Sequence, residues 1–177
     1  MANDLQQDFF ALFGLARRFR IDEATLESAY HELHSTVHPD RHAHLPDADR
    51  RRAMQWATRV NEAFDTLKKP LSRARYLVEL AGHDVGVETN TAMSPEFLME
   101  QMEWREAVEE AEQAADGSAL EHLHHRLRGH ARELVDTLAR QLDDEENVAA
   151  AAESVRRLMF LDKLRHEIDD ALEALDN

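Results

Sequence analysis

The sequence of 177 residues contains no cysteine. This absence excludes disulfide bonds, thiolate metal ligands and cysteine nucleophiles together. Glycine-rich phosphate loops are also missing, so we do not expect ATP to bind through a P-loop. Any metal site in this chain would have to rely on histidine and carboxylate side chains.

Glycine and proline are scarce, with five and four residues, whereas Ala, Leu, Glu and Arg are abundant. This composition favours an all-α fold, because these four are strong helix formers. No apolar run is long enough to cross a bilayer, and no charged-then-apolar leader precedes Phe9. We therefore predict a cytoplasmic protein that does not bind membranes.

Charge is distributed unevenly along the chain. Residues 1–75 carry 12 Lys and Arg against 11 Asp and Glu, whereas the remainder carries 9 against 25, so the net charges are +1 and −16. The contrast suggests two modules with different partners. The acidic second part also argues against nucleic-acid binding, because phosphates would be repelled. Adaptation of the surface to saline conditions is an alternative explanation of the acidic excess.

Two predicted helices flank the tripeptide His38-Pro39-Asp40. The first spans 22–37 with Asp22 as its N-cap, and the second spans 50–69 and begins close to Pro46. Proline has no backbone donor and steers the preceding residue away from helical dihedrals, so the first helix should end near Val37. The buried faces are predicted to comprise Leu26, Ala29, Tyr30, Leu33 and Val37 on the first helix, and Ala53, Trp56, Val60, Ala63, Phe64 and Leu67 on the second.

A helix, a His-Pro-Asp loop and a second antiparallel helix resemble a J-domain. The resemblance implies that this part of the chain docks on a DnaK-type chaperone and stimulates its ATP hydrolysis. A short apolar helix over 8–14, ended by Gly14, precedes this part of the chain. A further helix with Pro70 in its first turn follows it.

Beyond a linker at 82–93, three helix-length segments predict a three-helix bundle. The first begins at Ser94, a good N-cap followed by proline, and runs to about Ala115, before a turn at 116–118. The other two segments carry long leucine stripes. These stripes are Leu120, Leu123, Leu127, Ala131, Leu134, Leu138 and Leu142, and Leu158, Leu161, Leu164, Ile168, Leu172 and Leu175.

The first bundle helix has two apolar faces. At 100° per residue, one narrow sector suits the bundle core and contains Phe97, Trp104, Val108, Ala111 and Ala115. Leu98, Met99 and Met102 point nearly the opposite way. Such a helix must be covered by another element of the chain or present its second face to a partner, and the flexible thioether of methionine suits irregular interfaces.

Four stretches resemble the HscB family, J-proteins of iron–sulfur cluster assembly, in the same order along the chain. They are Leu12-Phe13-Gly14-Leu15, Pro70-Leu71-Ser72-Arg73-Ala74-Arg75-Tyr76-Leu77, Phe97-Leu98-Met99-Glu100-Gln101-Met102-Glu103-Trp104-Arg105-Glu106 and Phe160-Leu161-Asp162-Lys163-Leu164. The resemblance implies an L-shaped molecule. Its parts would be a J-domain with a connecting helix at 1–81, the linker at 82–93 and a C-terminal three-helix bundle at 94–177.

The resemblance also implies two partners and the residues that meet them. The bundle would bind the scaffold protein IscU and present it to the specialised chaperone HscA. The scaffold-binding residues would be Leu98, Met99, Met102, Glu103, Arg105 and Glu106, with Phe160 from the last helix. The chaperone-binding residues would be His38, Pro39 and Asp40, where the Asp40 carboxylate pairs with an arginine of the partner. Hydrolysis would occur on the partner, so we predict no catalytic residue, cofactor or metal in this chain.

The helix before His-Pro-Asp differs from the general J-domain pattern. J-domains carry several lysines and arginines there, whereas residues 30–37 offer His31 and His34 and no fixed positive charge. Basic residues occur instead at Arg41 and at 50–52. We therefore predict weak electrostatic steering by this helix, with possible pH sensitivity from its histidines.

Two other functions fit parts of the sequence. A J-protein with a different client, or a structural helical adaptor, would not need the Leu98, Met99 and Met102 face. Histidine-based metal handling is suggested by the groups His31, His34, His38, His42 and His44, and His122, His124, His125 and His130. Neither group is accompanied by a convincing carboxylate or thiol arrangement. A resident iron–sulfur cluster is disfavoured, because clusters are held chiefly by cysteine thiolates.

Overall fold

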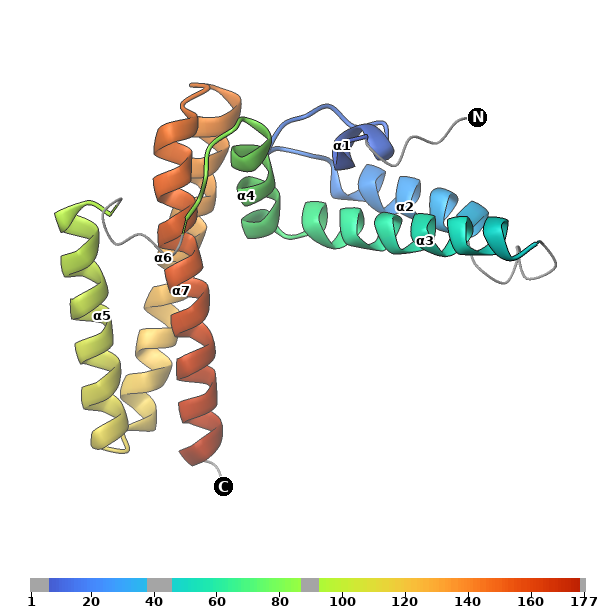
Figure 1. Ribbon diagram of the computed structural model, residues 1–177. Helices are drawn as coiled ribbons and strands as arrows, with labels where there is room; N and C mark the ends of the chain where they lie inside the picture. Colours follow the sequence, from blue (N-terminus) through green and yellow to red (C-terminus); the bar gives the residue numbers. More distant parts are fainter. Residues whose placement is uncertain (1–6, 38–45, 87–92, 176–177) are drawn as a thin grey trace. The chain divides into compact units, whose positions relative to one another are not determined.

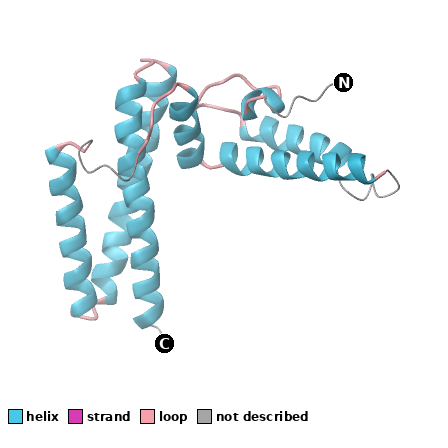
Figure 2. Cartoon of the chain, in the orientation of Figure 1, coloured by secondary structure: helices cyan, strands magenta, loops and turns pink. Residues whose placement is uncertain are grey.

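The computed structural model describes residues 7–37, 46–86 and 93–175. These residues contain seven helices and no strand, in agreement with the predicted all-α class (Figures 1 and 2). None of the described helices has a stretch long and apolar enough to cross a membrane. The chain divides into two compact units, Met1–Leu77 and Val78–Asn177.

The first unit is built on an antiparallel pair of helices, α2 (Glu23–Val37) and α3 (Asp47–Lys68), which lie side by side in Figure 1. Asp22 caps α2, since its carboxylate accepts hydrogen bonds from the Ala24 amide and the Thr25 hydroxyl. Between the helices, Tyr30 stacks on Phe64 with ring centroids 4.1 Å apart. The helical hairpin expected from the sequence is therefore present.

A small aromatic cluster packs against α3 of the hairpin. Helix α1 (Phe9–Leu12) is a single turn, shorter than the predicted 8–14, and Gly14 follows it with a φ of +66°. Phe9 stacks on Tyr76 of α4 (Pro70–Leu80) with centroids 4.5 Å apart, and the Phe9 amide donates to the Tyr76 hydroxyl. Arg59 of α3 lies 4.4 Å from the centre of the Phe9 ring. Burial raises the pKa of Tyr76, which keeps this hydroxyl neutral.

Asp8 caps α1 and gives this unit a pH-dependent contact. Burial acts to raise its pKa, but hydrogen bonds from the Ala11 amide and the Arg17 guanidinium, 2.6 Å away, outweigh burial and lower it. A lowered pKa stabilises the fold above the unfolded value near 3.9, and this stabilisation is lost as the pH falls through the folded value. We expect Asp8→Asn to cost about 0.5 kcal/mol at pH 7, because the pair is partly exposed and screened.

Urea unfolding of wild type and Asp8→Asn at pH 7 and pH 3 measures this difference. The difference should be smaller at pH 3 than at pH 7, because the stabilisation shrinks as the pH falls from the unfolded pKa towards the lowered folded pKa of Asp8. A difference that stays equal at both pH values would show that Asp8 acts through packing and not through its charge.

The second unit contains three long helices, α5 (Pro95–Gln113), α6 (Gly117–Asp143) and α7 (Val148–Leu175) (Figure 1). The predicted leucine stripes supply its core. Fully buried members include Leu120, Leu127, Leu138, Leu161, Leu164 and Ile168. The predicted second and third helices are therefore confirmed as packed elements of one bundle.

Two predicted core positions are wrong. Ala115 is exposed, because α5 ends at Gln113 and Ala115 adopts a φ of +49° in the following turn. Leu175 is 43% exposed, because it is the last residue of α7 and has little of the bundle beyond it. Helix periodicity predicts faces but not where the facing helices end.

The predicted linker contains a packed residue. Val85 is 1% exposed, although it lies between Gly82 and Gly86 in the segment interpreted as a linker. The boundary between the compact units falls inside α4, between Leu77 and Val78, several residues before the predicted end of the first module at 81. The domain limits inferred from the family resemblance thus remain a prediction.

Candidate functional site

Helix α5 exposes a row of large apolar side chains. Leu98, Met99 and Met102 are 38%, 63% and 70% exposed, whereas Phe97 and Trp104 on the opposite face are 1% and 8% exposed. The two faces expected from the 100° periodicity are therefore present in the structure. Exposed apolar side chains gathered in one place are typical of an interaction surface.

The start of α5 is fixed by its sequence. The Ser94 hydroxyl accepts from the Phe97 amide at 3.3 Å, and Pro95 occupies the first turn, where no backbone donor is needed. Ser94 also donates to Glu153 of α7 at 3.1 Å. These contacts set the rotation of α5, so that residues 98, 99 and 102 face away from the core.

Phe160 of α7 lies next to α5. Its ring meets Phe97 edge-on with centroids 6.0 Å apart, and the Arg105 guanidinium lies 5.6 Å from its centre. Arg105 also approaches Glu167 at 3.9 Å, while Glu103 and Glu106 are exposed. Six of the seven candidate residues thus lie on α5. The seventh, Phe160, lies beside α5 and contacts one of them, Arg105. Their role in binding a scaffold protein remains a prediction.

Sequence reasoning missed three side chains beside Phe160. Arg156, Met159 and Lys163 of α7 line a cavity together with Phe160 and Arg105. Their spacing of three, four and seven residues on one helix face was the signal that could have found them. It was hidden because Arg156 and Lys163 resemble ordinary surface charges in the sequence.

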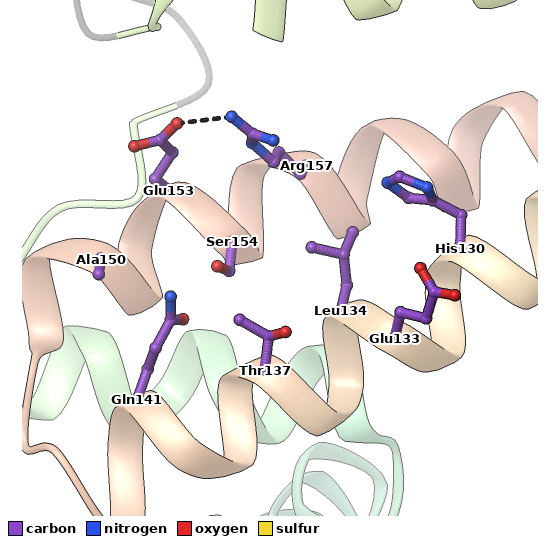
Figure 3. Close-up of a pocket in the computed structure, with 9 residues that line it drawn as sticks. All are labelled: His130, Glu133, Leu134, Thr137, Gln141, Ala150, Glu153, Ser154 and Arg157. Atoms are coloured by element: carbon purple, nitrogen blue, oxygen red, sulfur yellow. Dashed lines mark hydrogen bonds and ion pairs between the residues drawn. The ribbon is translucent and has the colours of Figure 1, made fainter. Parts of the chain in front are cut away.

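A second cavity of about 420 Å³ lies between α6 and α7 (Figure 3). Three of its side chains form ion pairs: Arg157 contacts Glu153 at 3.0 Å, as drawn, and Glu100 of α5 contacts His130 at 3.0 Å and Arg157 at 3.5 Å. These pairs tie α5 to both other helices of the bundle. We therefore interpret this polar cavity as part of the network that positions α5.

The predicted chaperone-binding residues His38, Pro39 and Asp40 lie outside the described residues. The structure describes the helices on either side, with α2 ending at Val37 and α3 beginning at Asp47. Arg50, Arg51 and Arg52 are exposed in the first turns of α3, and Arg50 pairs with Asp47 at 2.6 Å. On α2, His31 is exposed and His34 is half-buried.

The histidine groups do not form a metal site in the part of the chain that the structure describes. Across 7–37, 46–86 and 93–175, no three His, Asp or Glu side chains come together as metal ligands. His124 and His130 each contact a single carboxylate, Asp169 at 3.3 Å and Glu100 at 3.0 Å. His38, His42 and His44 of the first histidine group lie outside the described residues.

The part of the chain that the structure describes combines a helical hairpin with a helical bundle that exposes an apolar face of α5. The sequence profile described as the HscB C-terminal oligomerisation domain matches residues 93–169. A relative from Aromatoleum aromaticum, named co-chaperone protein HscB homolog, is 69% identical over 176 residues and covers 99% of both chains.

Solved structures agree with this assignment. Chaperone HscB from Vibrio cholerae is 38% identical, with a TM-score of 0.81 over 96% of this chain and 99% of that one. Human co-chaperone protein HscB is 28% identical, with a TM-score of 0.88 over 96% of this chain and 84% of that one. The chain belongs to the HscB family of co-chaperones.

Proposed function

We propose that this protein assists iron–sulfur cluster assembly by binding an IscU-type scaffold protein and delivering it to an HscA-type chaperone. It would also stimulate ATP hydrolysis by that chaperone and would not be an enzyme itself. Membership of the HscB family supports the co-chaperone role. The observation that carries the scaffold-binding part is the exposure of Leu98, Met99 and Met102 on α5.

The exposed face has the composition of a protein interface of modest affinity. Its apolar centre is bordered by the exposed side chains of Glu103, Arg105 and Glu106, which form a polar rim. Burying the exposed parts of these three side chains contributes about 4 kcal/mol in total, roughly half the binding free energy of a micromolar complex. The charged rim adds orientation more than affinity.

The chaperone-binding half of the proposal rests on the helical hairpin. Helices α2 and α3 are held together by the Tyr30–Phe64 stack and by the Lys68–Glu27 ion pair at 3.2 Å. The His-Pro-Asp tripeptide joins them in the sequence, and a carboxylate there can form a charge-assisted hydrogen bond with an arginine of the chaperone. Docking would favour the catalytic arrangement of the chaperone, where hydrolysis takes place.

Asp40→Asn is expected to lower stimulation of the chaperone ATPase by about tenfold or more, because the amide keeps the shape but loses the charge. The measurement is steady-state ATP hydrolysis by an HscA-type chaperone with this protein and an IscU-type scaffold. Asp65→Asn is the matched control, since Asp65 is an exposed carboxylate on α3 outside the loop. Scaffold binding by the Asp40 variant should equal that of wild type.

Each outcome separates the two halves of the proposal. Equal stimulation by wild type and Asp40→Asn would remove the assigned role of the tripeptide. If IscU has no effect on stimulation by wild type and does not bind to it, the scaffold assignment fails. The protein would then be a J-domain co-chaperone with a different client, the alternative that the sequence left open.

A further inference from the structure

Methionine supplies all the sulfur atoms of this chain, which has six methionines and no cysteine. Cysteine thiolates are the groups that oxidants usually attack first, so an oxidant that meets this protein finds only thioether sulfur. Oxidation turns a thioether into a sulfoxide, and methionine sulfoxide reductases can reverse this change. Reversible oxidation of this chain at sulfur is therefore confined to its methionines.

The methionines differ in how far solvent can reach them. Met102 and Met99 are the most exposed of those that the structure describes, at 70% and 63%, and Met54 of α3 follows at 56%. Met93 and Met159 are half-buried. Because oxidation depends on access to the sulfur atom, a dissolved oxidant should modify Met99 and Met102 before Met93 and Met159.

The two most exposed methionines belong to the same small surface. Met99 and Met102 are three residues apart on α5, so their side chains are neighbours on the helix. With Leu98 they form the apolar centre of the exposed face of α5. A sulfoxide replaces the apolar thioether by a polar S=O group, and a partner that covers this group has to remove its water. Burial of a polar group without a hydrogen-bond partner is unfavourable, so oxidation at this place opposes docking.

We propose that Met99 and Met102 are a reversible oxidation site, and that conversion of their thioethers to sulfoxides releases the docked scaffold protein. This inference rests on the proposed function and adds a regulation of the same surface. The oxidant is a peroxide. Each sulfur gives up two electrons and gains one oxygen atom, while the O–O bond of hydrogen peroxide breaks and leaves water. In the reverse step, a dithiol becomes a disulfide and the sulfoxide oxygen leaves as water.

The test begins with the purified full-length chain. It is treated with hydrogen peroxide, the peroxide is removed with catalase, and the oxidised methionines are identified by peptide mass spectrometry. An untreated IscU-type scaffold protein is then titrated calorimetrically. We expect oxidation of Met99 and Met102 to weaken binding by about 10- to 100-fold, the range for burying a polar group without a partner. The two epimer-specific methionine sulfoxide reductases, supplied with a dithiol, should restore the affinity.

Two leucine variants identify the sulfur atoms responsible. Met99→Leu/Met102→Leu keeps an apolar surface but has no sulfur there, so its affinity should be the same before and after treatment, whatever its starting value. Met54→Leu removes the third exposed methionine, which lies in the other compact unit. This variant should lose as much affinity on oxidation as wild type does.

Three results would overturn the inference and leave the proposed function standing, because the untreated chain would still bind the scaffold. The first is unchanged affinity of a chain oxidised at both Met99 and Met102. The second is an equal loss of affinity in the treated Met99→Leu/Met102→Leu variant. The third is faster oxidation of Met93 and Met159 than of Met99 and Met102. An untreated wild-type chain that does not bind the scaffold would overturn the inference and the proposed function together.

Discussion

Replacing Leu98, Met99 and Met102 together by alanine is expected to lower the affinity for an IscU-type scaffold by about a thousandfold. Met99 and Met102 each leave about two thirds of their surface available to a partner, and Leu98 leaves about one third. At roughly 25 cal/mol per Å² of apolar surface, these areas correspond to about 4 kcal/mol in total. Each 1.4 kcal/mol is a factor of ten in the dissociation constant.

Calorimetric titration of the scaffold protein measures this loss. Two matched controls remove exposed apolar side chains elsewhere: Leu175→Ala at the end of α7 and Met54→Ala on α3, which are 43% and 56% exposed. Both should bind the scaffold as wild type does. A triple variant with unchanged affinity would show that the exposed face of α5 does not bind the scaffold.

The triple variant should keep its basal effect on the chaperone but lose any extra stimulation caused by the scaffold. The two activities separate because the substituted residues lie in the second compact unit, whereas the hairpin that flanks the His-Pro-Asp tripeptide lies in the first. A parallel loss of both activities would indicate that the bundle also contacts the chaperone.

Sequence periodicity predicted the two faces of α5 well, because both are set by one uninterrupted helix. Ser94 and Pro95 fix the start, and every third or fourth residue up to Ala111 then faces the core. Local geometry and hydrophobic contrast placed Leu98, Met99 and Met102 opposite the core face but left open whether another element covers them. The structure shows that they are exposed.

Features that depend on two helices could not be predicted in the same way. The burial of Arg156 Nε and the approach of Arg105 to Phe160 result from the packing of α5 against α7. The first ten residues of α7 were not assigned to the third stripe, because an alanine-rich segment has little apolar contrast. The exposure of Leu175 likewise depends on where the neighbouring helices end.

Phe97→Ala is expected to destabilise the bundle by about 4 kcal/mol, which is typical of truncating a fully buried phenylalanine. Phe97 is 1% exposed, meets Phe160 edge-on and has the Arg157 guanidinium 5.3 Å from the centre of its ring. Thermal unfolding should show a transition lowered by roughly 10 °C, given about 2–4 °C per kcal/mol in a chain of this size.

The neighbouring substitution Leu98→Ala is the matched control, since it lies on the same turn of α5 but on the exposed face. It should leave thermal unfolding almost unchanged and weaken scaffold binding, whereas Phe97→Ala should strongly lower stability. Phe97→Ala should also affect binding below its melting temperature, because Phe160 loses the ring that supports it. Equal stability of Phe97→Ala and Leu98→Ala would contradict the assignment of the two faces of α5, and the docking surface would then have to be placed elsewhere.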